Sequence, residues 1–474
     1  MQYVSISRKL LPVLSFMMIC PYLFGQETPQ DRRRWLSSST VVSDDPRRIP
    51  VPPVPRGPEG SLVLKGGRVF DATGAPTREA TVVIQRNHIL KILPPGSTDW
   101  ASDARVIDVS GKTVMPGMID LHTHLTHVDP GDSIEASLSD SASTLRGLER
   151  MRYFIESGIT SIRDVASRDD VPFQLKQWVS ENRVPGPRIF PAGKLITAVG
   201  GHGAQGMSAA FPLKGMVREA SGPDDWRQAV REQFEAGADV IKIASHFSPA
   251  EVKAAVEEAH ALGIKVTCDC ETFYVQWAVE AGVDCIEHML PRTDETIRLM
   301  AQKHVDADPT LVVAIYLFDQ YGGYYYSTSR RFAWNKEMNL EVVRRMKDAG
   351  IRLGVGTDLV GDWWRSLPLP YITELHQFVK LGYTIPGALQ AATKTNAEIL
   401  DMSDKLGTLE PGKLADVIVV DGKPDQNLDD LEKMDIVIRD GYIVVQEGRI
   451  VTRRHEVKPP PKPRSGEQLT RPSD

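Results

Sequence analysis

The stretch EAGADVIKI, residues 235–243, contains the pattern that decides the fold: a helix end, a glycine, a short apolar strand and an ionisable residue. Gly237 stands where a helix C-terminus favours a left-handed residue, and the apolar run after it is continuous rather than alternating. The same pattern returns in ESGITSIRD (156–164), ALGIKVTCD (261–269), EAGVDCIEH (280–288) and DAGIRLGVGTD (348–358). Such repeats are typical of the α/β units of a parallel sheet. The sequence therefore predicts an α/β fold.

Repeated α/β units over residues 116–404 fit either a closed barrel or an open doubly wound sheet. An open sheet that binds a nucleotide has a glycine-rich phosphate loop after its first strand, and none is present in this sequence. Instead, ionisable residues close several different strands, which is how a barrel assembles its site. We therefore predict a (β/α)8 TIM barrel over 116–404. Ser248, Pro249 and Glu251 form a capping-box pattern that predicts a helix over 250–262.

Short strands separated by turn residues flank this region on both sides. They are predicted at 61–75, 80–92, 104–114, 415–420, 435–439 and 442–446, with Asp440-Gly441 as a hairpin turn. Because the two ends of the chain share this pattern, we expect residues 59–115 and 405–455 to pair into one small composite β-sandwich domain.

The N-terminus has the layout of a secretory signal peptide over residues 1–25. Arg8 and Lys9 precede a mainly apolar run that ends near Gly25. The run is shorter than the roughly 20 apolar residues that a bilayer-spanning helix needs, so we expect cleavage, no stable membrane span, and a secreted or periplasmic protein. Residues 26–58 are predicted to be a flexible lead-in, and residues 456–474 a disordered tail.

Composition limits the partners. The chain has 474 residues, 41% hydrophobic and 25% charged, with a net charge of −6. These values are typical of a globular protein and argue against nucleic acid or an anionic membrane as a partner. We expect a small-molecule or dipeptide-like substrate. Once the leader is removed three cysteines remain (Cys268, Cys270 and Cys285), and this odd number argues against a disulfide framework.

His122 and His124 close the first predicted barrel strand. Alternate side chains of a strand point the same way, so this pair can hold one cation, although an isolated His-x-His pair is as easily a surface feature. Later strands end in Lys242, His288 and Asp358. A buried lysine is costly unless it reaches solvent or a carboxylate, and a lone strand-end His or Asp is more often structural. Spacing alone favours the structural interpretation of Lys242. Taken with His122 and His124, however, His288 and Asp358 make a set of nitrogen and oxygen donors that suits zinc or a similar divalent ion.

Eight motifs support a family resemblance. They are PGMIDLHTH (116–124), GITSIRDV (158–165), GPRIFPAGKLITAVGGHG (186–203), ADVIKIAS (238–245), GVDCIEH (282–288), GTD (356–358), ALQAATKTNAEIL (388–400) and LGTLEPGKLADVIVVD (406–421). From about residue 66 to 451 the chain resembles the amidohydrolase superfamily, and within it the imidazolonepropionase-like and prolidase-like branch.

The resemblance implies a site with one or two divalent metal ions, zinc being the expected metal. His122 and His124 match ligands of the more buried metal, and His288 matches a ligand of the outer metal. Lys242 matches the lysine that relatives carboxylate to bridge two metals. Asp358 matches the residue that contacts the inner metal and acts as general base. His202 lies in the motif of the substrate loop and is a candidate substrate contact, or else an ordinary loop histidine.

The fifth predicted strand departs from the family. Relatives usually place a metal-binding His there, whereas this chain reads VTCDCE over 266–271. Counting from Gly263 puts Asp269 in the ligand position, and counting back from His288 puts Cys268 there. We prefer Asp269, because a deletion is better tolerated in a loop than within a strand. Glu271 shares its strand face and is a second candidate. The outer metal is then altered or absent, or the outer site is degraded.

The leading functional hypothesis is hydrolysis of an amide-like C–N bond in a small extracytoplasmic substrate, such as a dipeptide with a cyclic or basic C-terminal residue, or a cyclic amide. The alternatives are a heterocycle deaminase with a single metal and a catalytically impaired binding or assembly relative. Aromatic residues in 316–334 and the pair Trp363-Trp364 are expected either to line the pocket or to form a homo-oligomer contact.

Overall fold

The computed structural model describes residues 57–128, 139–204, 215–321, 336–360 and 362–451. The predicted signal peptide, nearly all of the lead-in and the predicted tail lie outside the described residues, as do residues 322–335 of the aromatic segment. Among the described residues, none of the helices combines the length and the apolar character that a membrane crossing requires.

Parallel strands form two sheets in the described part of the chain, ordered β6-β7-β8 and β10-β9-β11-β12-β13-β14. Their bounds are β6 (Met118–Thr123), β7 (Ile159–Asp164), β8 (Arg188–Pro191), β9 (Leu195–Ala198), β10 (Val217–Ala220), β11 (Val240–Ala244), β12 (Lys265–Asp269), β13 (Cys285–Glu287) and β14 (Asp306–Asp308). Every residue of β7, β11 and β13 is buried. Burial on both faces explains why the sequences of these strands lack the regular alternation of apolar and polar residues that a strand with one exposed face would have.

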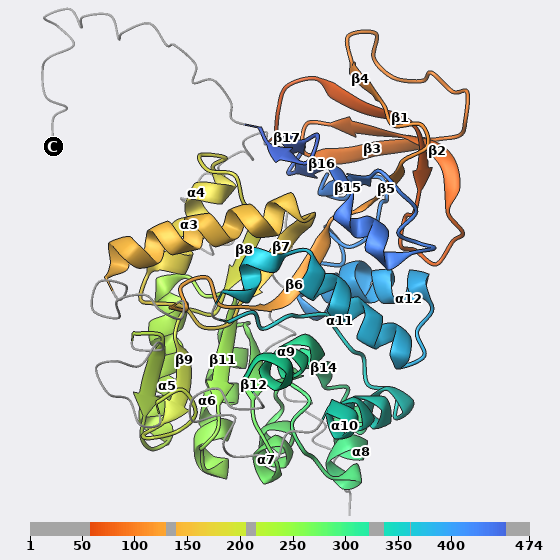
Figure 1. Ribbon diagram of the computed structural model, residues 1–474. Coiled ribbons are helices and arrows are strands. Elements are labelled where there is room, and N and C mark those ends of the chain that lie inside the picture. Colours follow the sequence, from red (N-terminus) through yellow and green to blue (C-terminus); the bar gives the residue numbers. More distant parts are fainter. Residues whose placement is uncertain (1–56, 129–138, 205–214, 322–335, 361, 452–474) are drawn as a thin grey trace, which may run out of the picture. The chain divides into compact units, whose positions relative to one another are not determined.

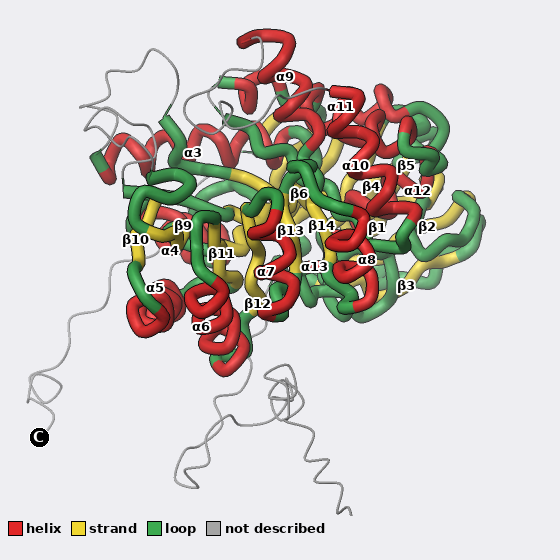
Figure 2. Tube along the Cα trace, turned by 90° about the horizontal axis from the view of Figure 1, so that it is seen from below, coloured by secondary structure: helices red, strands yellow, loops and turns green. Residues whose placement is uncertain are grey.

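Helices alternate with the strands along the chain. They are α3 (Asp140–Glu156), α4 (Val171–Ser180), α5 (Pro223–Ala236), α6 (Pro249–Ala261), α7 (Phe273–Ala281), α8 (Asp294–Gln302), α9 (Leu311–Tyr321), α10 (Lys336–Asp348), α11 (Leu369–Lys380), α12 (Ile385–Gln390) and α13 (Asn396–Ile399). Figure 2 shows α5, α6 and α7 along the outside of β11 and β12. The prediction of an α/β fold with parallel sheets is confirmed.

Local sequence explains several helix ends. Gly237 and Gly282 cap the C-termini of α5 and α7 with φ values of 103° and 97°, which residues other than glycine rarely adopt. Ser248 accepts a hydrogen bond from the backbone of Glu251, whose side chain bonds back to the Ser248 backbone, so α6 begins with the predicted capping box.

Backbone contacts connect the two parallel sheets through residues 353–358. Leu353 bridges to Ala307 of β14. On the other side, Val355 O accepts a hydrogen bond from Leu121 N at 3.1 Å, and Asp358 N donates to His122 O at 2.8 Å. This segment therefore runs between β14 and β6. A continuous ladder that joins the two sheets is not found among the described residues.

Strands from both ends of the described chain share another sheet (Figure 1), ordered β18-β17-β16-β15-β5-β1-β2-β3 with β4 beside β1. Their bounds are β1 (Ser61–Val69), β2 (Arg78–Gln85), β3 (His88–Leu93), β4 (Arg105–Asp108), β5 (Thr113–Pro116), β15 (Val417–Val420), β16 (Met434–Arg439), β17 (Tyr442–Gln446) and β18 (Arg449–Ile450). The two ends join where β5 pairs antiparallel with β15. The sandwich arrangement and the domain boundaries stay predictions.

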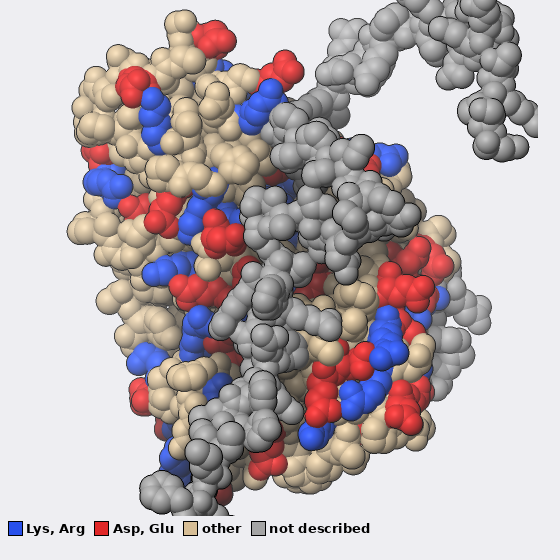
Figure 3. All heavy atoms as spheres, turned by 180° about the vertical axis from the view of Figure 1, so that it is seen from behind, with Lys and Arg blue, Asp and Glu red and all other residues tan. Residues whose placement is uncertain are grey.

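Charged side chains of both signs lie next to one another on the face shown in Figure 3. Ion pairs also link neighbouring helices: Arg227 of α5 lies 2.8 Å from Glu257 of α6, and Arg231 lies 2.7 Å from Glu258. Because exposed pairs of this kind contribute at most about 1 kcal/mol each, burial of apolar side chains is the main stabilising contribution.

The cysteines correct one expectation. Cys268 and Cys270 form a disulfide, with their Cα atoms 5.6 Å apart, and Cys285 is free and buried. The sequence argument relied on an odd count. An odd count is compatible with one bonded pair and one free thiol. Cys270 lies just past the end of β12 (Lys265–Asp269), and the chain there brings the two Cα atoms within disulfide distance.

Candidate metal centre

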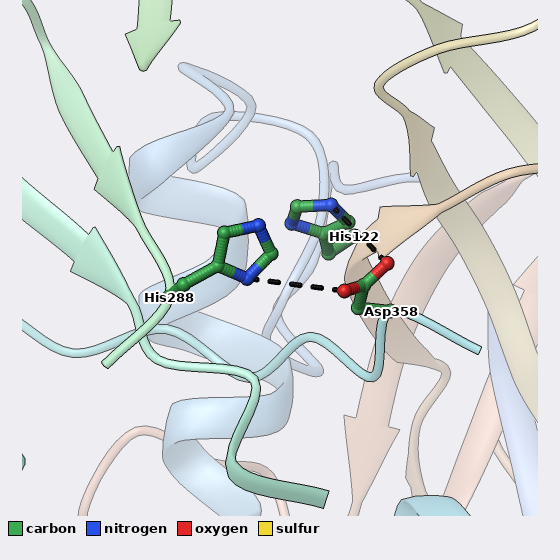
Figure 4. Close-up of side chains that lie close together, drawn as sticks. All are labelled: His122, His288 and Asp358. Atoms are coloured by element: carbon green, nitrogen blue, oxygen red, sulfur yellow. Dashed lines mark ion pairs between the residues drawn. The ribbon is translucent and has the colours of Figure 1, made fainter. Parts of the chain in front are cut away.

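Three predicted ligands converge from distant parts of the chain (Figure 4). His122 belongs to β6, His288 follows β13, and Asp358 closes the segment beside β6. The Asp358 Oδ1 atom lies 3.6 Å from His122 Nε2, and its Oδ2 atom lies 3.9 Å from His288 Nδ1. One ligand atom of each residue lies within 4.8 Å of the others. This spacing suits donors around a single cation.

His124 lies on the same side of the cluster, as the His-x-His spacing predicts. Its Nε2 atom is 3.1 Å from Asp358 Oδ1, and its Nδ1 atom is 3.1 Å from the carbonyl oxygen of Ala166. The carbonyl orients the ring so that Nε2 faces the carboxylate. Both histidines of the first strand therefore face Asp358.

His288 and Asp358 have left-handed backbones, with φ values of 61° and 50°. Residues other than glycine adopt this region at a cost of about 1–3 kcal/mol, and such residues cluster at functional sites. Both follow a buried stretch, at the edge where their side chains meet. The local fold thus stabilises two strained residues in the position that the cluster requires.

Asp269, at the end of β12, lies next to two histidines of the same cluster. Its Oδ2 atom is 2.9 Å from His202 Nε2 and 3.3 Å from His288 Nε2. Glu271 instead accepts a hydrogen bond from the Ser245 hydroxyl and lies 3.4 Å from His246 Nε2. Cys268 is in the disulfide and offers no thiolate. Among the three fifth-strand candidates, Asp269 is the one that faces the cluster.

Lys242 of β11 lies in the wall of the same cavity. Its side chain is 2% exposed, and its Nζ atom has no hydrogen-bond partner in the described structure. Leaving a buried ammonium without a partner costs several kcal/mol. A buried lysine amine without a hydrogen-bond partner, among imidazoles and carboxylates, fits a site in which this lysine is carboxylated or contacts a bound group.

The charge states of His122, Asp358 and Asp269 suit metal binding. Burial and Lys242 lower the pKa of His122 to about 3, so its ring is neutral at neutral pH. Burial raises the pKa of Asp358, but the histidines around it outweigh that effect and leave the pKa below 3.8. Burial also raises the pKa of Asp269, and His202 and His288 lower it well below 3.8. Neutral imidazole and ionised carboxylate are the forms that bind metal ions. Burial lowers the pKa of His288, but Asp269 and Asp358 outweigh that effect and raise it above 6.5, so a metal ion would compete with a proton at this ring.

One cavity is bordered by all six predicted metal ligands and by His202. Its remaining described lining is His127, Val165, Ala166, Leu195, Met216, Val217, Leu290, Val313, Leu317 and Val360. Sequence reasoning missed His127, although HTHLTH places it three residues after His124. The apolar walls were missed because valine and leucine are common in strands, helices and loops alike, and no pattern in the sequence distinguishes those that line a cavity.

The tryptophan pair corrects a second expectation. Trp363 and Trp364 are 4% and 1% exposed, and neither is among the residues that line the cavity. Trp364 packs edge-on against Tyr153 of α3, with ring centroids 5.1 Å apart. The pair is part of the core rather than a pocket wall or an oligomer contact, because a helix covers it.

Comparisons with known proteins agree with this site. Residues 113–444 match the model of the amidohydrolase family. The imidazolonepropionase of Geobacillus thermodenitrificans is 25% identical over 415 residues, which cover 78% of this chain and 91% of that protein.

Two solved structures are also similar. A prolidase complexed with N-methylphosphonate-L-proline is 28% identical with a TM-score of 0.73, covering 82% of this chain and 100% of that one. A Xaa-Pro dipeptidase with bound methionine in its active site is 26% identical with a TM-score of 0.73, covering 81% and 99%. The family match spans more than half of the chain and includes every residue of the cluster. This chain therefore belongs to the amidohydrolase family, whose members depend on metal ions, and it is a hydrolase that acts on carbon–nitrogen bonds.

Proposed function

We propose that this chain is an exported zinc hydrolase that cleaves the amide bond of a small dipeptide-like substrate with an apolar, cyclic C-terminal residue. The observation that carries the proposal is the convergence of His122, His288 and Asp358 around one cavity that also contains the orphaned Lys242 Nζ. A histidine that only packs in the core, or an aspartate that only caps a helix, would not need to lie beside the other two residues.

Each residue has a defined role in this proposal. His122, His124 and Asp358 would hold one ion, His288 and Asp269 would hold a second, and Lys242, if carboxylated, would supply an anionic ligand to both. When bound, the ions polarise the scissile carbonyl and lower the pKa of water. The Asp358 carboxylate, ionised because its pKa is depressed, accepts a proton from the attacking water and delivers it to the leaving nitrogen. His202 contacts the substrate from its loop.

The cavity walls support an apolar substrate group. Beyond the polar cluster, the described lining is made of aliphatic side chains and His127. Asp269 and Asp358 are the only carboxylates among the described lining residues, and the proposal uses both as ligands. A basic side chain would therefore find no counter-charge there, whereas a proline-like ring would bury apolar surface. A substrate of this kind also agrees with the names of the two similar solved structures.

The barrel and the export prediction are part of the same proposal. Residues 353–358 supply the last strand of a (β/α)8 barrel, supported by their backbone contacts with β6 and β14. Arg8, Lys9 and the apolar run after them support export. The disulfide between Cys268 and Cys270 also fits an oxidising compartment. We place the mature chain in the periplasm or outside the cell.

The test measures metal content and activity on the same preparation. Elemental analysis of the purified chain should give two zinc ions per chain. Xaa-Pro dipeptides should be hydrolysed faster than Xaa-Arg dipeptides, N-acyl amino acids or cyclic amides. Asp358→Asn is the control for contaminating peptidases and should have no activity. One metal with ammonia release from heterocycles would favour a deaminase, and absence of metal and turnover would favour a non-catalytic relative.

A further inference from the structure

Glu287 of β13 is fully buried, and both of its carboxylate oxygens have partners. The Oε2 atom lies 2.8 Å from His122 Nδ1. The Oε1 atom lies 2.7 Å from Arg163 Nη2 and also accepts a hydrogen bond from the Thr267 hydroxyl. Four strands therefore contribute to one buried polar network beneath the cavity.

Arg163 of β7 contacts β6, as Glu287 does. It binds the backbone of β6, whereas Glu287 binds a side chain. Its Nε atom donates to the carbonyl oxygen of Leu121 at 2.6 Å, and Leu121 directly precedes His122. Its Nη2 atom donates to Glu287 and lies 3.5 Å from Asp308 Oδ2. One planar guanidinium thus fixes both the backbone before His122 and the carboxylate that contacts the His122 ring.

This contact decides which nitrogen of His122 is available. A neutral imidazole carries one N–H and one lone pair, and an ionised carboxylate can only accept. Hydrogen bonding at Nδ1 therefore places the proton there and leaves the lone pair on Nε2. Nε2 is the atom that lies 3.6 Å from Asp358 Oδ1 at the cluster. The opposite tautomer would direct an N–H toward the metal position and could not bind a cation.

We propose that Glu287, held by Arg163 and Thr267, is a positioning residue that fixes the His122 tautomer and ring for metal binding. This inference rests on the proposed metal site. Glu287 immediately precedes His288, so β13 supplies both a proposed ligand and the carboxylate that orients another. Any displacement of β13 would then alter two ligands together.

Two other roles for Glu287 fit the contacts less well. His122, Glu287 and Asp308 are close enough to hold a second cation, but Arg163 already supplies the positive charge between the two carboxylates. A purely structural Glu287–Arg163 ion pair would leave the His122 contact without consequence. That alternative is separable by experiment, because it predicts a change in stability without a change in zinc affinity.

The test compares zinc affinity in metal-free Glu287→Gln and in the wild-type chain, by competition with a chromogenic chelator. We expect a 10- to 100-fold weaker affinity in the variant, about the loss seen when the outer partner of a metal-binding His is changed. Asp306→Asn is the matched control. Asp306 is a buried carboxylate paired with Arg352 at 2.7 Å, and it lies at the start of β14, at the other end of the strand from the cavity. Its zinc affinity should equal that of the wild type.

A second variant keeps the test decisive if Glu287→Gln does not fold. Thr267→Val preserves shape and removes only the hydroxyl that donates to Glu287, so we expect a smaller but measurable loss of zinc affinity. If the folded Glu287→Gln protein binds zinc as tightly as the wild type, the inference is wrong and the proposed function is unaffected. If only Thr267→Val folds, wild-type zinc affinity in that variant has the same meaning. A wild-type chain that binds no zinc would overturn both.

Discussion

His202 Nε2 and Asp269 Oδ2 lie 2.9 Å apart, which joins a loop histidine to the carboxylate at the end of β12. The same oxygen lies 3.3 Å from His288 Nε2. Asp269 thus occupies the strand-end position at which the sequence resemblance leads us to expect a histidine. Because Asp269 lies between two imidazoles, we expect its carboxylate to determine whether the site binds a second ion.

Asp269→Asn should reduce the bound zinc from two ions to one and lower kcat/KM at least about tenfold, because a neutral amide is a weaker ligand than a carboxylate. Elemental analysis and dipeptide hydrolysis measure both effects. Glu271→Gln is the matched control, since Glu271 contacts Ser245 and His246 instead, and it should retain the wild-type stoichiometry. If Glu271→Gln loses the ion and Asp269→Asn keeps it, the assignment of the fifth-strand ligand is wrong.

Lys242→Met should stabilise the metal-free protein while abolishing activity. The substitution removes a buried ammonium without a hydrogen-bond partner, so the free energy of unfolding should rise by about 1–3 kcal/mol. Urea denaturation of chelator-treated protein measures this change. Lys265→Met, which removes an ion pair with Asp401 at 3.0 Å, is the control and should give no increase. A destabilised Lys242→Met protein would show that the ammonium has a partner.

Glu374 on α11 should contribute a decrease in stability with rising pH. Burial raises the pKa of this carboxyl from 4.5 to about 8, although the backbone N–H groups of Leu311 and Val312 act in the opposite direction. The folded protein keeps a proton that the unfolded chain releases near pH 4.5, so its stabilising contribution is lost as the pH rises toward about 8.

Urea denaturation between pH 5 and pH 8, at about one-unit intervals, should therefore give a weaker pH dependence in Glu374→Gln than in the wild type. Some dependence should remain, because burial also raises the pKa of Asp120, to about 7. Identical slopes for the two proteins would contradict the assignment to Glu374.

Val217→Asp should shift substrate preference toward basic C-terminal residues. Val217 of β10 lines the cavity and is only partly buried, so a carboxylate there can remain hydrated. Relative to Val217→Asn, the kcat/KM ratio for Xaa-Arg over Xaa-Pro should rise by about threefold or more, which corresponds to a modest, partly exposed ion pair. An unchanged ratio would indicate that the C-terminal residue binds elsewhere in the cavity.

Much of the site could be predicted from the sequence, because parallel strands place their final residues at one edge. Strand-end position and alternation were enough to nominate His122, His288 and Asp358, and the structure brings these three together. The family resemblance added Lys242 to the candidate ligands. The Lys242 amine has no hydrogen-bond partner in the described structure, which is compatible with that role. The helix predicted over 250–262 is observed as α6, Pro249–Ala261.

The remaining features depend on partners that are distant in sequence. Arg163 and Glu287 look like ordinary charged residues in their own strands, and only packing of β7 against β13 and β6 makes them one network. Trp363 and Trp364 were expected at a surface because aromatic character does not reveal which neighbour covers a side chain. No pattern around Cys268 distinguished a bonded pair from free thiols.

The pairing of β5 with β15 has a consequence for how the protein is made. Residues 113–116 emerge from the ribosome long before residues 417–420, and they hydrogen-bond only with that late strand on one side. The edge of β5 therefore stays open throughout most of synthesis, and the sheet closes only when nearly the whole chain has been released. A chain truncated before β15 would keep a bare strand edge and should aggregate.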